Sequence, residues 1–430
     1  MDTLQKLFEE QMNKKFKSPI IMAEIIKRQM EKKGVVLSKK QIKKLEKQFK
    51  KNKRDEFSFT IDFDDNQCDV LGISKDQENN LDIGDITETL DEIQKEIIAN
   101  LADSIPKLAK EAALPILSQL RKNAPAMLKE HRKFIKGFEH QLNQDWKKAF
   151  DVFEMFIVIA FESGEEVNQE FRKDATQREN YILEVLTRLH ARSCQIAYEV
   201  MTLLKSGYAD GAHARWRSLH EIAVIGSFIK KHDNETAEKY LLHEKIESFK
   251  AANLYQKYCK DLGYEPFTQK EYDSIKDEYD KLISRFGKPY KNSYGWAASA
   301  LNKDDPNFTE IEENSELDHM RPFYKLASHN VHANPKGIMF KLGLLDNSEN
   351  TLLAGPSNVG FTDPAQSTVM SLGLITITLL TSKPSMDNLI ASNILLELEP
   401  EIGKEFFKIQ KEIEDREATY QSTLHKQEES

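Results

Sequence analysis

Two short segments of the 430-residue sequence gather the side chains that metal-free phosphodiester chemistry uses. One is HARWRSLHE at 213–221, and the other is FYKLASHNVHANP at 323–335. Cleavage of an RNA phosphodiester needs a base for the 2′-hydroxyl proton, an acid for the leaving oxygen and a cation beside the phosphate. The side chains that could fill these roles, and that form the predicted catalytic site, are Arg215, Arg217, His220, Glu221, His329 and His332.

The first segment has helical spacing. His213, Arg217 and Glu221 follow one another at every fourth position, so on a helix they form a polar row, with His220 beside it. Arg217 and Glu221 are spaced for an ion pair along this row. The structural alternative is a solvent-exposed row with one modest salt bridge, and the segment by itself favours that alternative.

The second segment crowds polar side chains at the end of a predicted helix. His329 and His332 lie one helical turn apart, so both could face one site among Ser328, Asn330 and Asn334. Polar groups at a helix end must be satisfied by water, by caps or by a ligand. The structural alternative is a histidine cap that complements the helix dipole. Since no nearby cysteine or paired acid completes a ligand set, we expect no metal.

Several familiar motifs are absent from the sequence. It contains no GxGxxG, GxxxxGK[ST], GxSxG or HExxH, so nucleotide-cradling loops and zinc-protease sites have no support and no cofactor is expected.

The three cysteines, Cys68, Cys194 and Cys259, form no CxxC pair, which is typical of a reducing compartment. The first residues contain no apolar signal region, and no stretch approaches the roughly 18 apolar residues of a membrane span. These features predict a cytoplasmic protein without a membrane segment.

Charge is distributed unevenly along the chain. Residues 1–54 hold 17 Lys and Arg against 6 Asp and Glu, whereas the remainder holds 44 against 64. A cationic segment of this kind attracts phosphate backbones, so we expect it to bind nucleic acid. Two alternatives are a solvated lysine-rich helix and an arm that docks on its own acidic body. The predicted nucleic-acid-binding residues are Lys39, Lys40, Lys43, Lys44, Lys47, Lys50, Lys51 and Arg54.

The elements that must position these residues are predicted to be helices. Lys, Glu, Leu and Ile dominate and only 17 glycines occur, which favours an all-α fold. Residues 178–207 and 208–231 carry the clearest patterns and are joined by a tight turn, so they should pack antiparallel in a multi-helix bundle. Their shared core should contain Val185, Leu189, Leu219 and Ile222. Further upstream, we expect long helices that break near Pro106, Pro115 and Pro125.

The same patterns predict how the chain is divided. GIMFKLGLL and TLLAGPSN flank the polar DNSEN, which favours a small β-hairpin at 337–358 between helices. Alternating phenylalanine and isoleucine in EFSFTIDFDD is typical of a half-buried strand or an extended linker. The predicted parts are a basic helical arm at 1–55, an extended linker or strand at 56–82, a helical middle at 83–170, a helical domain with the hairpin at 171–400, and a C-terminal helix and tail at 401–430.

Four stretches occur in an order that resembles an uncharacterised prokaryotic family, a domain of unknown function, over about residues 135–385. They are GFEHQLNQDWKKAFDVFEMFI, LLKSGYADGAHARWRSLHEI, AEKYLLHEKIESFKAANLYQKY and YKLASHNVHANP. The helical hairpin with its Arg and His residues also resembles the HEPN superfamily, which includes ribonucleases of toxin–antitoxin, abortive-infection and CRISPR systems. The R-x(4–6)-H motif of those enzymes is matched by Arg215 and His220, although position 216 is Trp rather than the usual polar residue. The resemblance implies a HEPN-like core and a ribonuclease site.

Together these observations predict a metal-independent, RNA-directed endoribonuclease, an effector of stress or phage defence. Its expected partners are RNA or another nucleic acid and a protein partner or antitoxin, and we expect a homo-oligomer. One alternative is a non-catalytic helical module that binds nucleic acid or a protein. Another is a purely structural oligomeric helical protein. The enzyme hypothesis requires that segments 213–221 and 323–335 line one cleft.

Overall fold

Every element of the described chain is helical. The computed structural model describes residues 18–51, 59–75, 82–174, 179–346 and 350–428. Within these ranges there are α-helices and short 3-10 helices but no strand, so the protein is all-α, as predicted. The chain forms two compact units, Met1–Lys133 and Phe134–Ser430.

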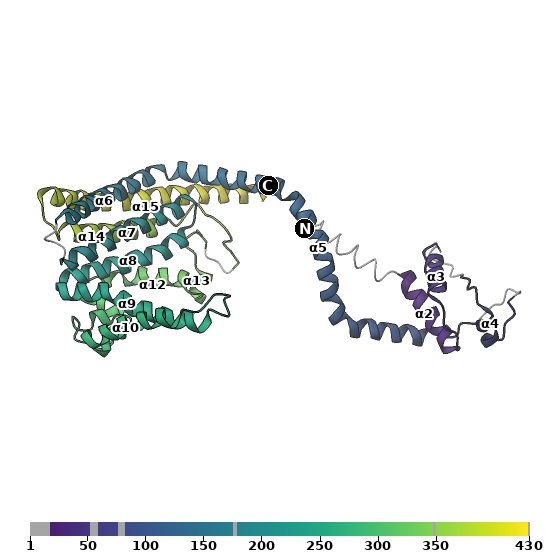
Figure 1. Cartoon of the computed structure of the whole chain (residues 1–430). Helices are drawn as coiled ribbons and strands as arrows, with labels where there is room; N and C mark the ends of the chain where they lie inside the picture. Colours follow the sequence, from purple (N-terminus) through teal and green to yellow (C-terminus); the bar gives the residue numbers. More distant parts are fainter. Residues whose placement is uncertain (1–17, 52–58, 76–81, 175–178, 347–349, 429–430) are drawn as a thin grey trace. The chain divides into compact units, whose positions relative to one another are not determined.

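The first unit is built around the basic helix. It contains α2 (Ser18–Lys32), α3 (Lys39–Lys51), α4 (Asp65–Leu71) and the first part of α5 (Thr87–Asp145) (Figure 1). Ser38 and Gln41 form the capping box that opens α3: the Ser38 N–H donates to Gln41 Oε1 at 2.8 Å, and the Gln41 N–H donates to Ser38 Oγ at 3.4 Å. The buried face of α3, with Leu45 and Phe49, packs on the apolar side of α2.

The segment after α3 is extended without being a strand. Phe59, Ile61 and Phe63 all pack against the core of the first unit, as their alternation predicts. The side chain of Gln48 takes the place of a neighbouring strand, because it donates to the Thr60 carbonyl at 2.9 Å and accepts from the Thr60 N–H at 2.8 Å. This side chain satisfies the Thr60 backbone, so no sheet is needed here.

The second unit is a helical bundle (Figure 1). Its long helices are α6 (Lys147–Lys173), α7 (Tyr181–Lys205), α8 (Ala209–Lys231), α9 (Asn234–Tyr258), α10 (Gln269–Phe286), α14 (Thr362–Leu380) and α15 (Met386–Glu428). Between α10 and α14 the chain makes the short elements η2 (Lys288–Lys291), η3 (Gly295–Ala297), α11 (Phe308–Asn314), η4 (Asp318–Met320), α12 (Arg321–Val331) and α13 (Pro335–Met339). The strongly apolar α14 packs against α6, α7, α8 and α15.

The predicted pairing of α7 with α8 is confirmed. Three residues join the two helices, which pack against each other along their length as antiparallel neighbours. Val185, Leu189 and Leu219 are buried in their shared core and Ile222 is partly buried against it. Gly207 makes the connection with φ of +86°, and a Cβ there would come within 2.8 Å of Pro356 Cβ. Only glycine combines this backbone conformation with so close an approach.

The β-hairpin predicted at 337–358 is wrong. Residues 337–339 belong to α13, and the described residues that follow have an irregular backbone. The N–H groups of Leu342 and Gly343 donate to the carboxylate of Asp210 at 3.0 and 3.4 Å, and the Ser357 N–H donates to the Gly207 carbonyl at 2.9 Å. A side chain and a turn from the start of α8 therefore supply the acceptors that a partner strand would have supplied.

The predicted breaks at Pro106, Pro115 and Pro125 are also wrong, because α5 continues through all three prolines. A proline in a helix removes one backbone donor and displaces the carbonyl four residues earlier. For Pro115 and Pro125 these carbonyls belong to Glu111 and Arg121, which are both exposed. Water can reach the backbone at both positions, so the helix tolerates the interruption.

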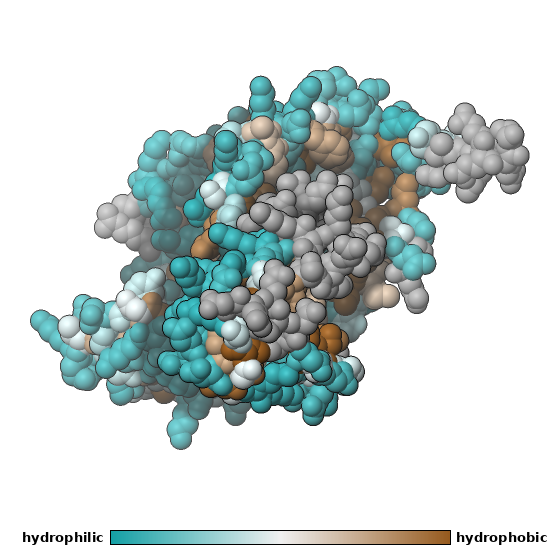
Figure 2. Space-filling view, turned by 90° about the vertical axis from the view of Figure 1, so that its right-hand side faces the viewer, coloured by the Kyte–Doolittle hydropathy of each residue, from teal (hydrophilic) through white to brown (hydrophobic). Residues whose placement is uncertain are grey.

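The described helices include no candidate for a membrane span. No helix among them is long and apolar enough to cross a lipid bilayer. The face in Figure 2 is largely hydrophilic, with hydrophobic side chains in small separate groups. Cys68, Cys194 and Cys259 are unpaired thiols buried inside the fold.

Candidate functional site

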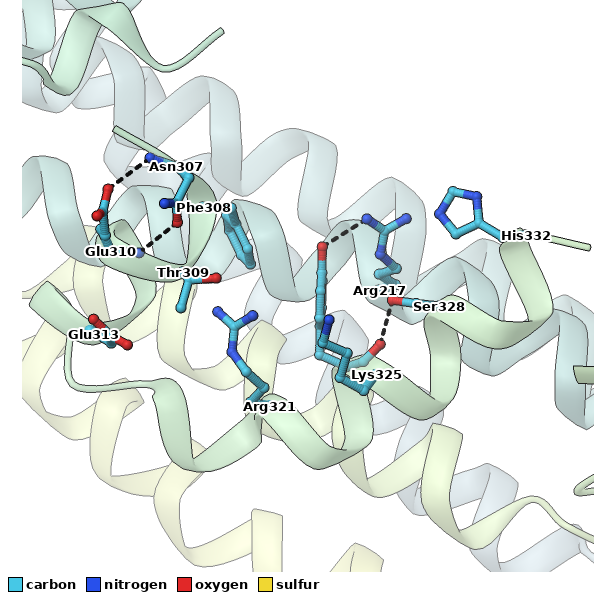
Figure 3. Close-up of a pocket in the computed structure, with 11 residues that line it drawn as sticks. Arg217, Asn307, Phe308, Thr309, Glu310, Glu313, Arg321, Lys325, Ser328 and His332 are labelled. Carbon is cyan, nitrogen blue, oxygen red and sulfur yellow. Dashed lines mark hydrogen bonds between the residues drawn. The ribbon is translucent and has the colours of Figure 1, made fainter. Parts of the chain in front are cut away.

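An open pocket of about 690 Å³ lies where α8, α11 and α12 meet. Its lining, shown in Figure 3, consists of Arg217, Asn307, Phe308, Thr309, Glu310, Glu313, Arg321, Tyr324, Lys325, Ser328 and His332. The residues that α12 and its C-cap contribute to this lining share one face of the helix. They are Arg321, Lys325, Ser328 and His332, which are spaced by four, three and four residues. The segments 213–221 and 323–335 therefore do meet at one pocket, as the enzyme hypothesis requires.

Arg217 is held in a defined orientation at this pocket. Its Nη2 donates to the Tyr324 hydroxyl at 2.7 Å and lies 3.0 Å from Glu221 Oε1. The Tyr324 hydroxyl in turn donates to Glu221 Oε1 at 2.7 Å, and the guanidinium carbon lies 4.8 Å from the centre of the Tyr324 ring. Burial, together with the bond to Glu221, raises the pKa of Tyr324 to about 12, so this phenol stays protonated.

Arg321 is anchored by a buried carboxylate. Glu312 is completely buried on α11, forms an ion pair with Arg321 and accepts a hydrogen bond from His220. Because a carboxylate oxygen only accepts, His220 Nε2 carries the proton in its 2.8 Å bond to Glu312 Oε1. A carboxylate buried without such partners would cost several kcal/mol, so the three groups depend on one another. His220 is itself 2% exposed and does not line the pocket.

The two ends of the pocket differ in charge. Figure 3 shows Arg217, Lys325, Ser328 and His332 toward one end and Glu310 and Glu313 toward the other. The Glu310 carboxylate is already engaged, since it accepts from the Asn307 N–H and pairs with Lys303. The end formed by Arg217, Lys325, Ser328 and His332, called the cationic end below, can therefore attract an anion.

Of the six predicted catalytic residues, only Arg217 and His332 line the pocket, whereas Arg215, His220, Glu221 and His329 do not. Arg215 points to α7, where it pairs with Glu199, and it does not line the pocket. His329 is half-buried and also outside the lining, and its carbonyl would lie 2.1 Å from a Cβ added at Gly337. His213, predicted in the polar row with Arg217, is instead fully buried and stacks on Trp216 with 5.2 Å between ring centres. Burial lowers the pKa of His213 to about 4, so its ring is neutral.

The two asparagine side chains of the second segment make hydrogen bonds that stabilise the fold and do not line the pocket. Asn330 donates to Asp210 at 3.3 Å, and the Asn334 side chain caps α13 by accepting from the Lys336 N–H at 2.9 Å. Ser328 and His332 are therefore the polar residues of the cluster that face the pocket.

Sequence reasoning missed Arg321, Tyr324, Lys325 and the contribution of α11. One available signal was the row of Arg321, Lys325, Ser328 and His332, which repeats along one helical face. The role of Glu312 had no local signal, because its partner His220 lies 92 residues earlier in the chain.

In the first unit, α3 presents a lysine face, formed by Lys39, Lys40, Lys43, Lys44, Lys47 and Lys50. All six side chains are exposed, on the opposite side of the helix from the buried Leu45 and Phe49. Lys44 forms an ion pair with Asp62. The Lys51 side chain and Arg54 fall outside the described residues.

In the part of the chain that the structure describes, no group of three or more His, Cys, Asp or Glu side chains could hold a metal ion. The chemistry available at the pocket is that of guanidinium, ammonium, imidazole, hydroxyl, amide, carboxylate and aromatic groups.

Comparison with known proteins identifies one family. Residues 183–350 match the model of a family of unknown function, DUF5677. No curated protein and no solved structure matches the chain. All eleven residues that line the pocket fall inside the matched range.

Proposed function

We propose that this protein binds RNA and that the cationic end of the pocket holds a phosphate group. The observation that carries the proposal is the convergence of Arg217, Arg321 and Lys325 on one open pocket from two different helices. Glu221 and Glu312, which orient the two guanidinium groups, do not themselves line the pocket. A ligand would therefore meet the cations rather than their carboxylate partners.

These side-chain types suit a phosphate in particular. A guanidinium with a fixed orientation can donate two parallel hydrogen bonds to phosphate oxygens, and a lysine adds a mobile point charge. The Ser328 hydroxyl, whose O–H donates to the Tyr324 carbonyl at 2.7 Å, adds a polar oxygen on the same face of α12. Arg217 Nε is buried and has no hydrogen-bond partner, so it is an unused donor at this site.

The pocket also has an aromatic wall that suits a base. The rings of Phe308 and Tyr324 stack with 5.3 Å between their centres and an interplanar angle of 30°, and both line the pocket. Unstacked RNA bases bind to such rings while arginine and lysine hold the backbone. A single-stranded RNA segment is therefore the nucleic acid that the site fits best.

The lysine face of α3 supports the same proposal. Only Lys44 among its six members is paired with a carboxylate among the described residues of the first unit. The others are free to replace counterions along a phosphate backbone, which makes binding strong at low salt and weak at high salt.

Replacing Lys43, Lys44, Lys47 and Lys50 with Gln should flatten the salt dependence of RNA binding. Each lost phosphate contact lowers the slope of log K against log salt by about 0.7 for a single strand. Fluorescence anisotropy of a labelled oligoribonucleotide at several salt concentrations measures this slope. The same change at Lys257, Lys270, Lys276 and Lys281, exposed on α9 and α10, serves as a charge-matched control in the second unit. An unchanged slope in the α3 variant would remove this helix from the interface.

A metal-independent endoribonuclease is the second candidate function, and one observation favours it. His332 and Arg217 line the same pocket, so a base and a cation can act on one phosphate. In this proposal the His332 imidazole takes the 2′-hydroxyl proton, the 2′-oxygen bonds to phosphorus, and the bond to the 5′-oxygen breaks. Lys325 gives that oxygen a proton, which leaves a 2′,3′-cyclic phosphate and a 5′-hydroxyl.

We rank RNA binding above cleavage because only two of the six predicted catalytic side chains line the pocket. Arg215 and His220, the pair that matches the HEPN motif, are committed to Glu199 and Glu312. The α7–α8 hairpin still supports the proposal of a HEPN-like core, since α8 carries both residues of that motif and packs antiparallel to α7. Any cleavage by this protein would rest on His332.

His332→Ala should separate the two functions. If the protein cleaves RNA, loss of this base should slow cleavage by roughly 10²–10⁴-fold, because that is the usual contribution of general acid–base catalysis. Binding of an uncleavable 2′-deoxy analogue should change little. Mass spectrometry of the products measures cleavage, and His329→Ala, one turn away and outside the pocket, is the matched control. Equal cleavage by His332→Ala and the unaltered protein would leave only the binding function.

A further inference from the structure

A second pocket, of about 860 Å³, differs from the first in character, because its lining is aromatic and acidic rather than cationic. Residues of α7, α8 and α9 line it together with the segment around η3. Its walls include Tyr240, Tyr294 and Trp296, and the Tyr240 and Trp296 rings meet edge to face with 5.0 Å between their centres.

His243 gives this pocket a buried acceptor. Its side chain is 7% exposed, and Nε2 lies 3.1 Å from the Tyr290 carbonyl and 2.9 Å from the Asn292 carbonyl. Carbonyl oxygens only accept, so Nε2 must carry the ring proton and donate to them. Burial lowers the pKa of His243, which keeps the ring neutral. The other nitrogen, Nδ1, is therefore left with a lone pair.

A second acceptor lies beside this lone pair. Glu247 Oε1 is 3.9 Å from His243 Nδ1, so two groups that can only accept face each other without a proton between them. The ammonium of Lys250, at the protein surface, is 2.7 Å from the same Glu247 oxygen. Exposed pairs of this kind are weak, so Lys250 would compete only modestly with a ligand.

The charges around the pocket favour a cation. Three carboxylates, Glu184, Glu244 and Glu247, and one guanidinium, that of Arg188, line it. Glu184 is paired with Arg172 and Arg188, and Glu244 with Lys245, so Glu247 is the carboxylate that a ligand could reach beside His243. Aromatic rings attract cations through their electron-rich faces, and the effect grows where water is excluded. Val185, Leu189 and Ile225 add apolar surface that suits an alkyl chain.

We propose that this pocket binds a primary alkylammonium group, whose N–H groups donate to His243 Nδ1 and Glu247. The aromatic rings then surround the positive charge, and the alkyl chain packs on the apolar wall. The same chemistry occurs in a free amine and in a lysine side chain, and suitable probes distinguish these two sources.

Saturation-transfer NMR titrations of the full chain test the proposal with butylammonium as the probe. Tetramethylammonium carries the charge without an N–H group, and 1-butanol carries the alkyl chain without the charge. Butylammonium should bind more tightly than either. Nα-acetyl-lysine methylamide tests the second source: tighter binding than butylammonium would identify a lysine side chain, and weaker binding would identify a free amine.

Two substitutions with opposite expected effects sharpen the test. Glu247→Gln should weaken butylammonium binding by about tenfold or more, because it removes a charge-assisted hydrogen bond. Lys250→Gln should strengthen binding, because it removes the competing ammonium. Glu278→Gln, an exposed change on α10, should have no effect. The proposal fails if butylammonium does not bind, if tetramethylammonium or butanol binds equally well, or if both substitutions weaken binding alike.

Discussion

Arg217→Gln should weaken binding of a single-stranded RNA by roughly 10- to 100-fold, because it removes charge-assisted bonds to a phosphate. The substitution leaves the surrounding fold supported, since Tyr324 still donates to Glu221. Fluorescence anisotropy at one fixed salt concentration measures the loss. No other single substitution proposed for this protein should lower the affinity for RNA as much.

Arg215→Gln is the matched control. Arg215 has the same charge, lies on the same helix two positions away and pairs with Glu199 outside the pocket. A general attraction of RNA to positive charge would make the two variants equally weak binders. If the pocket holds the phosphate, only Arg217→Gln should lose affinity, and equal losses would contradict the proposed site.

Glu312→Ala should lower the free energy of unfolding of the second unit by about 3–5 kcal/mol, the usual result of removing one partner of a buried ion pair. The change leaves His220, which is 2% exposed, and Arg321 without the carboxylate that they share. Chemical denaturation followed by tryptophan fluorescence reports on this unit, because all three tryptophans, Trp146, Trp216 and Trp296, lie in it.

The neighbouring Glu313→Ala is the control for this prediction. Glu313 is exposed, so its removal should change stability by no more than about 0.5 kcal/mol. If Glu312→Ala is no more destabilising than Glu313→Ala, then the buried cluster of His220, Glu312 and Arg321 does not support the pocket.

The parts of the fold that could be predicted are those whose causes are local. The antiparallel α7 and α8 follow from apolar residues at helical spacing and a short turn at Gly207, all within one continuous stretch. The capping box of Ser38 and Gln41 is likewise a pattern of four residues. Such features are set by neighbours in sequence, so periodicity and capping rules find them.

The parts that failed depend on distant partners. The hairpin predicted at 337–358 does not form because Asp210, more than 130 residues earlier, accepts from the backbone at Leu342 and Gly343. Contacts of this range are absent from any local pattern. The short helix α4 is a different case, since its capping box of Asp64 and Gln67 and its C-cap Gly72 are local signals that the prediction did not use.

The candidate site was predicted in part for the same reason. Arg217 and His332 were recognised from the density of polar residues around them, and both line the pocket. His220 belongs to the same segment, yet its side chain points into the core, where Glu312 of α11 accepts its hydrogen bond. Which side of a helix faces ligand and which faces a buried partner is decided by the helices packed against it.

The proposal that the pocket binds RNA is tested most directly by photocrosslinking. A single-stranded RNA that contains 4-thiouridine is bound to the full chain, irradiated and digested, and the crosslinked peptides are identified by mass spectrometry. The proposal predicts crosslinks within 307–313 or 321–332, the α11 and α12 segments that line the pocket, and their loss in Arg217→Gln. Crosslinks confined to other parts of the second unit, or crosslinks that persist unchanged in that variant, would contradict it.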